Sequence, residues 1–303
     1  MRNIKTENSF LRGALKIALP VSLQSMLMSS FSMIDQVMVG RLGMNEIAGV
    51  EVGGKLAFIF TFALSSIAGV CSIMVSQYLG KKDEDALHKS ISVNLLAAFC
   101  TGLLFFIAGE CFSFQIASFF TKDKNIIPLA TDYIKIISFH FLFSCIASIL
   151  AVPILCRGKT YIPLCISAGT AVLNTTLNYV LIFGRFGFRA LGIKGAAVAS
   201  VVSQSANLLL LLIAFLRVNG ALHFSLKLKK EKGLQYCAML LPALANEFLW
   251  ALGQTVFTSI YGHLGTEALA SMSLTNPVQG LFIGALSGLS QAAGILIGKR
   301  LGS

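Results

Sequence analysis

The stretch ALPVSLQSMLMSSFSMIDQVMVGRLG, from Ala18 to Gly43, decides the fold class of this chain. It is apolar and long enough to cross a bilayer as a helix, which takes roughly 20 residues. One carboxylate, Asp35, lies inside the apolar run. Because a charge at membrane depth is costly, such a residue usually faces a wet cavity and acts on an ion or a substrate. The stretch therefore predicts a membrane helix that carries a functional acid.

A second stretch, LPALANEFLWALGQTVFTSIYGHLG, repeats the first from Leu241 to Gly265. Pro242 corresponds to Pro20 and Gly262 to Gly40, both at a shift of 222 residues (242 minus 20, 262 minus 40). Both prolines are expected to bend their helices. An even number of predicted spans separates corresponding points, so the two copies share one orientation. This favours parallel repeats around an axis along the membrane normal, as in several transporter folds.

The composition also indicates a membrane protein. Of the 303 residues, 55% are hydrophobic and only 12% are charged, against roughly 25% charged in soluble domains; the mean hydropathy is +0.78. The net charge of +11 would suit a nucleic acid, but the basic residues lie between apolar segments. We therefore expect the lipid bilayer as a partner and no nucleic acid. The seven cysteines show no CxxC spacing and are expected to be small apolar packing residues.

Eight segments are long and apolar enough to span a membrane. They are 14–39, 53–79, 91–112, 128–153, 161–184, 192–216, 234–261 and 273–298. If the N-terminus lies inside, sixteen Lys and Arg residues fall on the inner side and seven on the outer side. Since basic residues favour the cytoplasmic side, we expect a multi-pass protein of the plasma membrane with both termini in the cytoplasm.

The repeat divides the chain into three parts. Residues 1–218 are expected to form an N-lobe of six transmembrane helices, 219–233 a basic cytoplasmic linker, and 234–303 the first two helices of a C-lobe. Because the first copy has six spans and the second has two, we expect the chain to be truncated by about four helices. The two-helix hairpin would then leave one apolar face unsupported.

Polar residues inside the spans fall on helix faces that are expected to line a central cavity, because polar side chains in a bilayer need partners or water. Besides Asp35, the candidates are Gln24 and Gln36 in the first span, Asn174 and Asn178 in the fifth, Ser200 and Gln204 in the sixth, and Glu247 and Gln254 in the seventh. Serine and threonine hydroxyls are mostly expected to bond to their own helix, whereas Asp35 and Glu247 are expected to be functional.

Other features favour structural roles. Two ridges of small residues lie on the eighth span and predict close helix packing. They are formed by Gly280, Gly284 and Gly288, and by Gly294, Gly298 and Gly302. His140 lies well inside the fourth span, where we expect a satisfied hydrogen bond rather than a proton relay.

The sequence lacks the motifs of catalysis, namely HExxH, GxSxG, a P-loop and any Cys/His cluster. We therefore expect neither an enzyme nor an ATP-driven pump, and no cofactor. If the protein moves a solute, an ion gradient should drive the movement.

Four motifs in this order give the chain a family resemblance. They are ALPVSLQ at Ala18–Gln24, QYLGKKD at Gln77–Asp83, NTTLNYVLIFGRFGFRALGIKGAAVAS at Asn174–Ser200 and LLPALANEFLW at Leu240–Trp250. Over essentially its whole length, the chain resembles the multidrug and toxic compound extrusion (MATE) family of secondary transporters. The resemblance implies an all-α membrane fold of two six-helix bundles around a cavity that opens alternately to each side. It also implies multidrug efflux, in which bulky and often cationic compounds are expelled in exchange for protons or sodium.

The resemblance also assigns a cation-coupling site. Asp35, fifteen residues after Pro20, takes the role of the family's first-helix acid. Asn174 matches a family asparagine of the fifth helix, but Asn178 stands where some members have an aspartate, which leaves proton and sodium coupling both open. Asp35, Asn174 and Asn178 are accordingly candidate ligands for sodium. Glu247 is the candidate for an acid that some sodium-linked members use, at a different distance from the proline.

Two rival functions stay open on the sequence. A lipid-linked oligosaccharide flippase of the same superfamily would need cations deep in its cavity to hold a diphosphate, and no Arg or Lys lies on a polar stripe inside a span. Alternatively, the truncated chain transports nothing and is a fragment or an interaction partner. The sequence names neither the substrate nor the oligomeric state.

Overall fold

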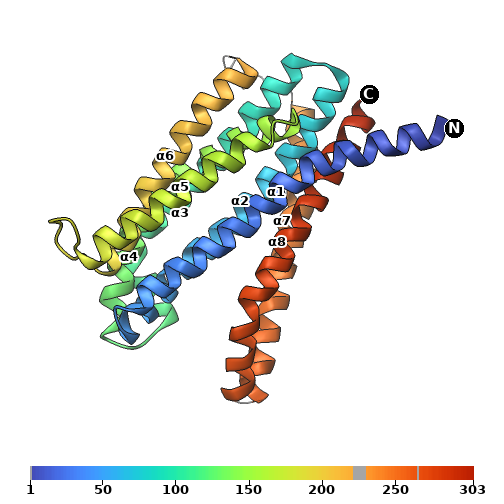
Figure 1. Cartoon of the computed structure of the whole chain (residues 1–303). Coiled ribbons are helices and arrows are strands. Elements are labelled where there is room, and N and C mark those ends of the chain that lie inside the picture. The colour runs from blue at the N-terminus through green and yellow to red at the C-terminus, as the bar shows by residue number, and fades with distance from the viewer. Residues whose placement is uncertain (1, 221–229, 265) are drawn as a thin grey trace.

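The chain folds as an all-helical membrane protein (Figure 1). A computed structural model describes the backbone of residues 2–220, 230–264 and 266–303, and the side chains of residues 13–220, 236–254, 256, 257, 260 and 279–303. The helices of this described part are α1 (Arg2–Gly40), α2 (Met44–Lys81), α3 (Glu84–Phe120), α4 (Ile126–Cys156), α5 (Tyr161–Phe183), α6 (Ile193–Asn219), α7 (Lys230–Leu264) and α8 (Thr266–Gly302). All eight are apolar and long enough to cross a membrane, which confirms the predicted fold class.

Most helices continue beyond the predicted spans. The second span was predicted over 53–79, whereas α2 begins at Met44. Hydropathy marks only the part of a helix that lies in lipid, so the polar first turns of a longer helix escape it. Between α2 and α3 the chain turns at Lys82, in a left-handed conformation with φ 56°. Asp83 then caps α3 by accepting a hydrogen bond from the backbone N–H of Ala86 at 2.9 Å.

The core of the first six helices is built around α4. It packs against α2, α3 and α6, and its Ile134, Phe141 and Ile149 are fully buried. Small residues let the helices approach closely: a Cβ atom at Gly102 would lie 2.6 Å from the sulfur of Cys145. Such close contact supplies packing energy that lipid chains cannot replace.

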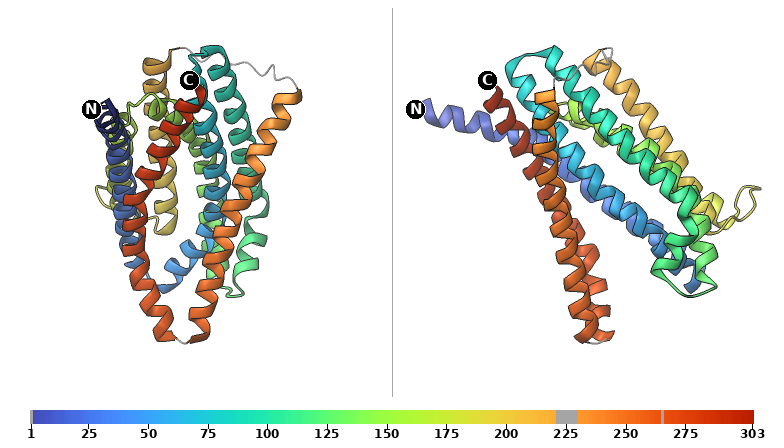
Figure 2. Two further views of the ribbon diagram at one scale, coloured as in Figure 1. Left: turned by 90° about the vertical axis from the view of Figure 1, so that its right-hand side faces the viewer. Right: turned by 180° about the vertical axis from the view of Figure 1, so that it is seen from behind.

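Helices α7 and α8 form a hairpin that diverges from the other six helices (Figures 1 and 2). The hairpin approaches α1 and α2 at the end that carries both chain termini, and separates from them toward the turn between α7 and α8. Its apolar side chains are widely exposed, Leu249 to 66% and Phe282 to 68%. The described helices therefore do not close into one eight-helix bundle, and the division into an N-lobe and a partial C-lobe stays a prediction.

The glycines of α8 determine how closely it packs. Cβ atoms at Gly284 and Gly288 would meet α1, and Cβ atoms at Gly298 and Gly302 would meet α2. The predicted packing role is thus confirmed at these four positions. At Gly280 and Gly294 no described residue lies within 4 Å of an added Cβ atom, so the described residues give no support for a packing role there.

The two hairpins that the repeat relates have matching helix boundaries. Helix α2 begins at Met44 and α8 at Thr266, which again differ by 222 residues (266 minus 44). Helices α1 and α7 contain Pro20 and Pro242 without interruption, and α1 changes direction part-way along its length (Figure 1). Most of the predicted linker, 219–233, lies outside the described residues.

Candidate functional site

Three residues of the predicted coupling site meet between α1 and α5. Asn178 donates a hydrogen bond from Nδ2 to Oδ1 of Asp35 at 2.8 Å. Asn174, one turn earlier on α5, lies beside both residues. Asp35 is partly buried and Asn178 is buried. The spacing of four residues on α5 explains this geometry, because residues at i and i+4 share a helix face.

The amide of Asn174 fits the site in two orientations related by a half-turn. In one, its Oδ1 accepts a hydrogen bond from Nδ2 of Asn178 at 3.2 Å. In the other, its nitrogen donates to Oδ2 of Asp35 at 3.0 Å, and its oxygen accepts from the backbone N–H of Ser200 on α6 at 3.3 Å. The second orientation suits an ionised carboxylate, which only accepts hydrogen bonds. The site thus connects α1, α5 and α6.

A second polar contact joins the same two helices further along. Gln24 of α1 donates from Nε2 to the hydroxyl of Ser167 on α5 at 2.8 Å. Thr170, which lies on the same face of α5, bonds instead to carbonyl groups of its own helix. The polar face that the sequence predicted on α5 is therefore the face that contacts α1.

Asp35 has no basic partner among the described side chains. Their ion pairs are Arg157 with Glu84, Lys194 with Asp132, and Lys55 with Glu51, and none of them includes Asp35. The described residues also hold no group of three His, Cys, Asp or Glu side chains that would suit a metal of the zinc type. The site therefore offers carboxylate and amide oxygens, which suit a proton or a hard cation.

The other predicted cavity residues are spread over the structure. Gln36 is exposed on α1, while Gln204 of α6 and Gln254 of α7 are partly buried. Glu247 of α7 accepts a hydrogen bond from the hydroxyl of Ser65 on α2 at 3.4 Å. Glu247 therefore lies where α7 of the hairpin faces α2. The single cavity that these residues were predicted to share stays a prediction.

The structure also adds contacts that the sequence did not specify, and one residue, Tyr133, that it did not single out. Ser200 contributes its backbone N–H rather than the expected side chain. His140 of α4 hydrogen-bonds to the backbone of Ser200, as expected for a structural histidine, although its Nδ1 is buried without a described partner. Tyr133 of α4 is close enough to Asp35 to interact electrostatically. Backbone donors and neighbours on α4 depend on helix packing, so no sequence spacing could have indicated them.

Comparison with known proteins identifies the family. The model of the family MatE matches residues 20–180 and 242–303, well over half of the chain. The chain belongs to the MatE family. Both matched stretches begin at the prolines that the internal repeat relates.

Curated relatives of this MatE chain come from bacteria. It is 27% identical over 281 residues to "Probable multidrug resistance protein YoeA" of Bacillus subtilis, covering 90% of the chain and 61% of the relative. It is 24% identical over 292 residues to "Probable multidrug resistance protein NorM" of Thermotoga maritima, covering 95% of the chain and 62% of the relative. The MatE chain thus spans about three-fifths of the length of these relatives.

Solved structures share the fold. The D35N mutant of the Vibrio cholerae MATE transporter VcmN matches with a TM-score of 0.89 at 16% identity, over 97% of this chain and 67% of that one. A structure described as an outward-facing conformation of a multidrug resistance MATE family transporter matches with a TM-score of 0.84 at 14% identity, over 95% of this chain and 65% of that one. At these identities, the likeness establishes the MatE fold alone.

Proposed function

We propose that the chain works as a secondary active multidrug antiporter, which exports cationic, amphiphilic compounds in exchange for H⁺ or Na⁺. The observation that carries the proposal is the Asp35 cluster, a partly buried carboxylate with amide partners and no described basic partner. The names of the curated relatives support drug compounds as substrates. The protein would lie in the cell membrane with its N-terminus in the cytoplasm.

The exchange follows from competition for one negative charge. An ionised Asp35 attracts either the coupling ion or a cationic drug, since a carboxylate in a medium of low dielectric gains strongly from a nearby positive charge. Once a proton or sodium ion neutralises it, the attraction for the drug is lost. Occupancy by the ion on one side of the membrane would therefore release the drug there.

The two orientations of Asn174 couple the charge of Asp35 to the helices around it. When Asp35 is ionised, the Asn174 nitrogen donates to it and the Asn174 oxygen accepts from Ser200. When Asp35 carries a proton on Oδ2, the half-turned amide places an oxygen where that proton can be donated. The bond to Ser200 is then lost, so neutralisation would loosen the connection between α5 and α6.

A sodium ion would use the same oxygens. Oδ1 of Asn178 is buried without a hydrogen-bond partner among the described residues. Such an atom costs free energy unless it finds a donor or a cation. Together with Asp35 and the oxygen of Asn174, it supplies the kind of oxygen ligands that a hard cation prefers. The donor set is thus compatible with either coupling ion.

Helix α1 would transmit the change to the hairpin. It carries Asp35 near one end and contacts α8 through the hydroxyls of Ser22, which donates to the carbonyl of Ala285, and of Ser25, which lies 3.0 Å from the Ser287 hydroxyl. Pro20, which removes one backbone donor from the same helix, gives α1 a place to bend. The hairpin of α7 and α8 meets the other six helices at the predicted cytoplasmic end and separates from them at the opposite end (Figure 2). An outward-open transporter would have this arrangement.

The test is efflux of a fluorescent organic cation such as ethidium from proteoliposomes, driven separately by a proton gradient and by a sodium gradient. We expect the Asp35→Asn variant to insert into the membrane normally but to lose gradient-driven transport. The neutral amide neither takes up a proton nor carries a negative charge that attracts a cation. Asp85→Asn is the matched control, since it removes one exposed charge from the first turn of α3. Transport by Asp35→Asn at the rate of the unaltered protein would refute the proposal.

The same variants can be followed without transport. Trp250, the single tryptophan of the chain, has its ring centroid 5.5 Å from that of Phe62. Its emission therefore reports how α7 sits against α2. We expect sodium or acid to change this emission in the unaltered protein and in Asp85→Asn, but not in Asp35→Asn. Whichever ion produces the change is the coupling ion.

A further inference from the structure

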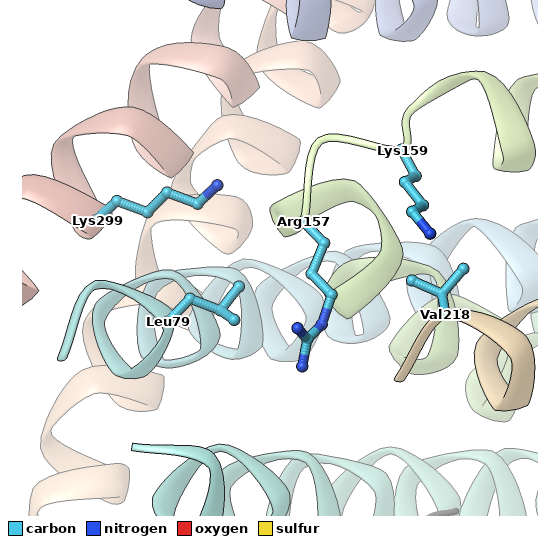
Figure 3. A pocket seen from close by; sticks show the side chains of 5 residues that line it. All are labelled: Leu79, Arg157, Lys159, Val218 and Lys299. Carbon is cyan, nitrogen blue, oxygen red and sulfur yellow. The ribbon is translucent and has the colours of Figure 1, made fainter. Parts of the chain in front are cut away.

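A basic pocket lies at the predicted cytoplasmic end, apart from the Asp35 cluster (Figure 3). Its volume is about 430 Å³, and its lining comes from four places in the fold. These are Leu79 of α2, Arg157 and Lys159 of the connection between α4 and α5, Val218 of α6 and Lys299 of α8. The pocket therefore lies between the six-helix part and the hairpin.

The charges of the pocket are unevenly balanced. Arg157 is held in place, with Nη2 bonded to both carboxylate oxygens of Glu84 at 2.9 and 3.1 Å and Nε bonded to Oδ1 of Asn219 at 2.6 Å. Its charge is thereby compensated. Lys159 and Lys299 belong to none of the ion pairs of the described residues. Since no carboxylate lines the pocket, its lining carries positive charge in excess.

We propose that this pocket binds the phosphate group of an anionic phospholipid of the cytoplasmic leaflet. Arginine and lysine side chains are the usual protein partners of phosphate oxygens. Basic pockets between transmembrane helices on the cytoplasmic side are suited to anionic headgroups. Leu79 and Val218 add apolar walls next to the charges, which suit the glycerol and upper acyl part of a lipid better than a free ion.

The bound headgroup would bridge the two parts of the molecule. Lys299 extends from α8 toward Arg157 and Lys159 of the six-helix part (Figure 3). A phosphate between these side chains attracts both Lys299 of α8 and Lys159, which follows α4, and so holds α8 against α2 and α4 at this end. Anionic lipid would therefore stabilise the arrangement in which the cytoplasmic ends are together.

Two simpler roles for Lys159 and Lys299 predict a different response to lipid. Lysines also orient membrane proteins and offset the negative ends of helices, and α4 and α8 both end near this pocket. Neither role produces saturable binding of a lipid. Binding that saturates, and that depends on these two lysines in particular, therefore separates the alternatives.

The experiment is a titration of the purified, delipidated full chain in neutral detergent with short-chain phosphatidylglycerol, followed by native mass spectrometry and by thermal unfolding. We expect one saturable lipid and a rise in unfolding temperature, with phosphatidylcholine giving neither. Lys159→Gln/Lys299→Gln should weaken the affinity by about 30-fold, since each lysine near an anionic lipid strengthens binding about fivefold. Lys122→Gln/Lys124→Gln removes the same charge from exposed positions at the opposite end and should bind normally.

Three results would overturn the proposal. They are equal weakening in both double variants, equal binding of phosphatidylcholine, and displacement of the lipid by millimolar inorganic phosphate, which would show a site for free phosphate. Lys159→Arg/Lys299→Arg keeps the charge and should restore binding, which guards against misfolding of the glutamine variant. Because no transport is measured, the outcome is independent of the antiport proposal.

Discussion

Replacing Gly288 by alanine should separate α8 from α1. A Cβ atom at this position would lie 2.6 Å from the backbone nitrogen of Ser22, and would also clash with the Ser22 hydroxyl and the carbonyl of Ala18. Ordinary contact begins at about 3.4 Å. Because two of the three atoms belong to the α1 backbone, no side-chain rotation relieves the clash. The helices must move apart by close to 1 Å.

The cost follows from the contacts that this movement breaks. Overpacking of this kind costs about 1–3 kcal/mol, and the hydrogen bond from Ser22 to Ala285 contributes about 1 kcal/mol more. Alanine regains about 0.5–1 kcal/mol because it favours the helix more than glycine does. The net loss is about 2 kcal/mol, or roughly a 30-fold change in the unfolding equilibrium.

Gly294→Ala provides the matched control on the same helix. Within 4 Å of its Cβ position the described residues leave open space, so only the gain in helix preference remains. Unfolding in mixed micelles with increasing SDS, followed by circular dichroism, compares the two variants. If Gly288→Ala is as stable as Gly294→Ala, the close contact between α8 and α1 does not exist as described.

Two further substitutions test other contacts. Tyr236→Phe removes the hydroxyl that donates to Oδ1 of the fully buried Asn94 at 3.2 Å, and should lower the free energy of unfolding by about 1 kcal/mol, whereas Tyr161→Phe at an exposed position should leave it unchanged in the same SDS titration. Asn178→Asp places a second carboxylate beside Asp35, so the site should bind the coupling cation more tightly. The Trp250 emission should then reach half of its change at roughly a tenth of the ion concentration that the unaltered protein needs. An unchanged midpoint would contradict the assigned site.

The helices themselves could be predicted from the sequence because hydropathy measures what the bilayer selects. Each predicted span corresponds to one observed helix, in the predicted order, and only the spans 161–184 and 192–216 extend one residue beyond their helices, at Gly184 and Gly192. The predicted ends of the helices were less accurate, as at Met44, because a helix can continue into water beyond the membrane, where hydropathy does not detect it. The polar face of α5 was visible in the sequence, since amides inside a bilayer must find partners. Its contact with α1 was implied only by the family resemblance, which grouped Asp35 with Asn174 and Asn178.

The site could be predicted only as far as residue type and helical phase allow. Asp35 stood out because a lone carboxylate in an apolar helix is costly. The two asparagines stood out because they are one turn apart. The part played by the backbone of Ser200 depends on how α6 packs against α5, which leaves no pattern in the side chains.

The direction of the hairpin could not be predicted for a reason specific to membranes. Lipid is as apolar as a neighbouring helix, so hydrophobicity does not indicate which face of α7 or α8 is packed and which meets lipid. Phe282 is exposed to 68% while Ile295 on the same helix is fully buried, although both are large and apolar. Glycine carries part of this information, but only where a neighbour approaches: a Cβ atom at Gly298 would meet Ser76 of α2, whereas a Cβ atom at Gly294 would find no described residue within 4 Å. The sequence therefore shows where close packing is permitted, and the structure shows where it occurs.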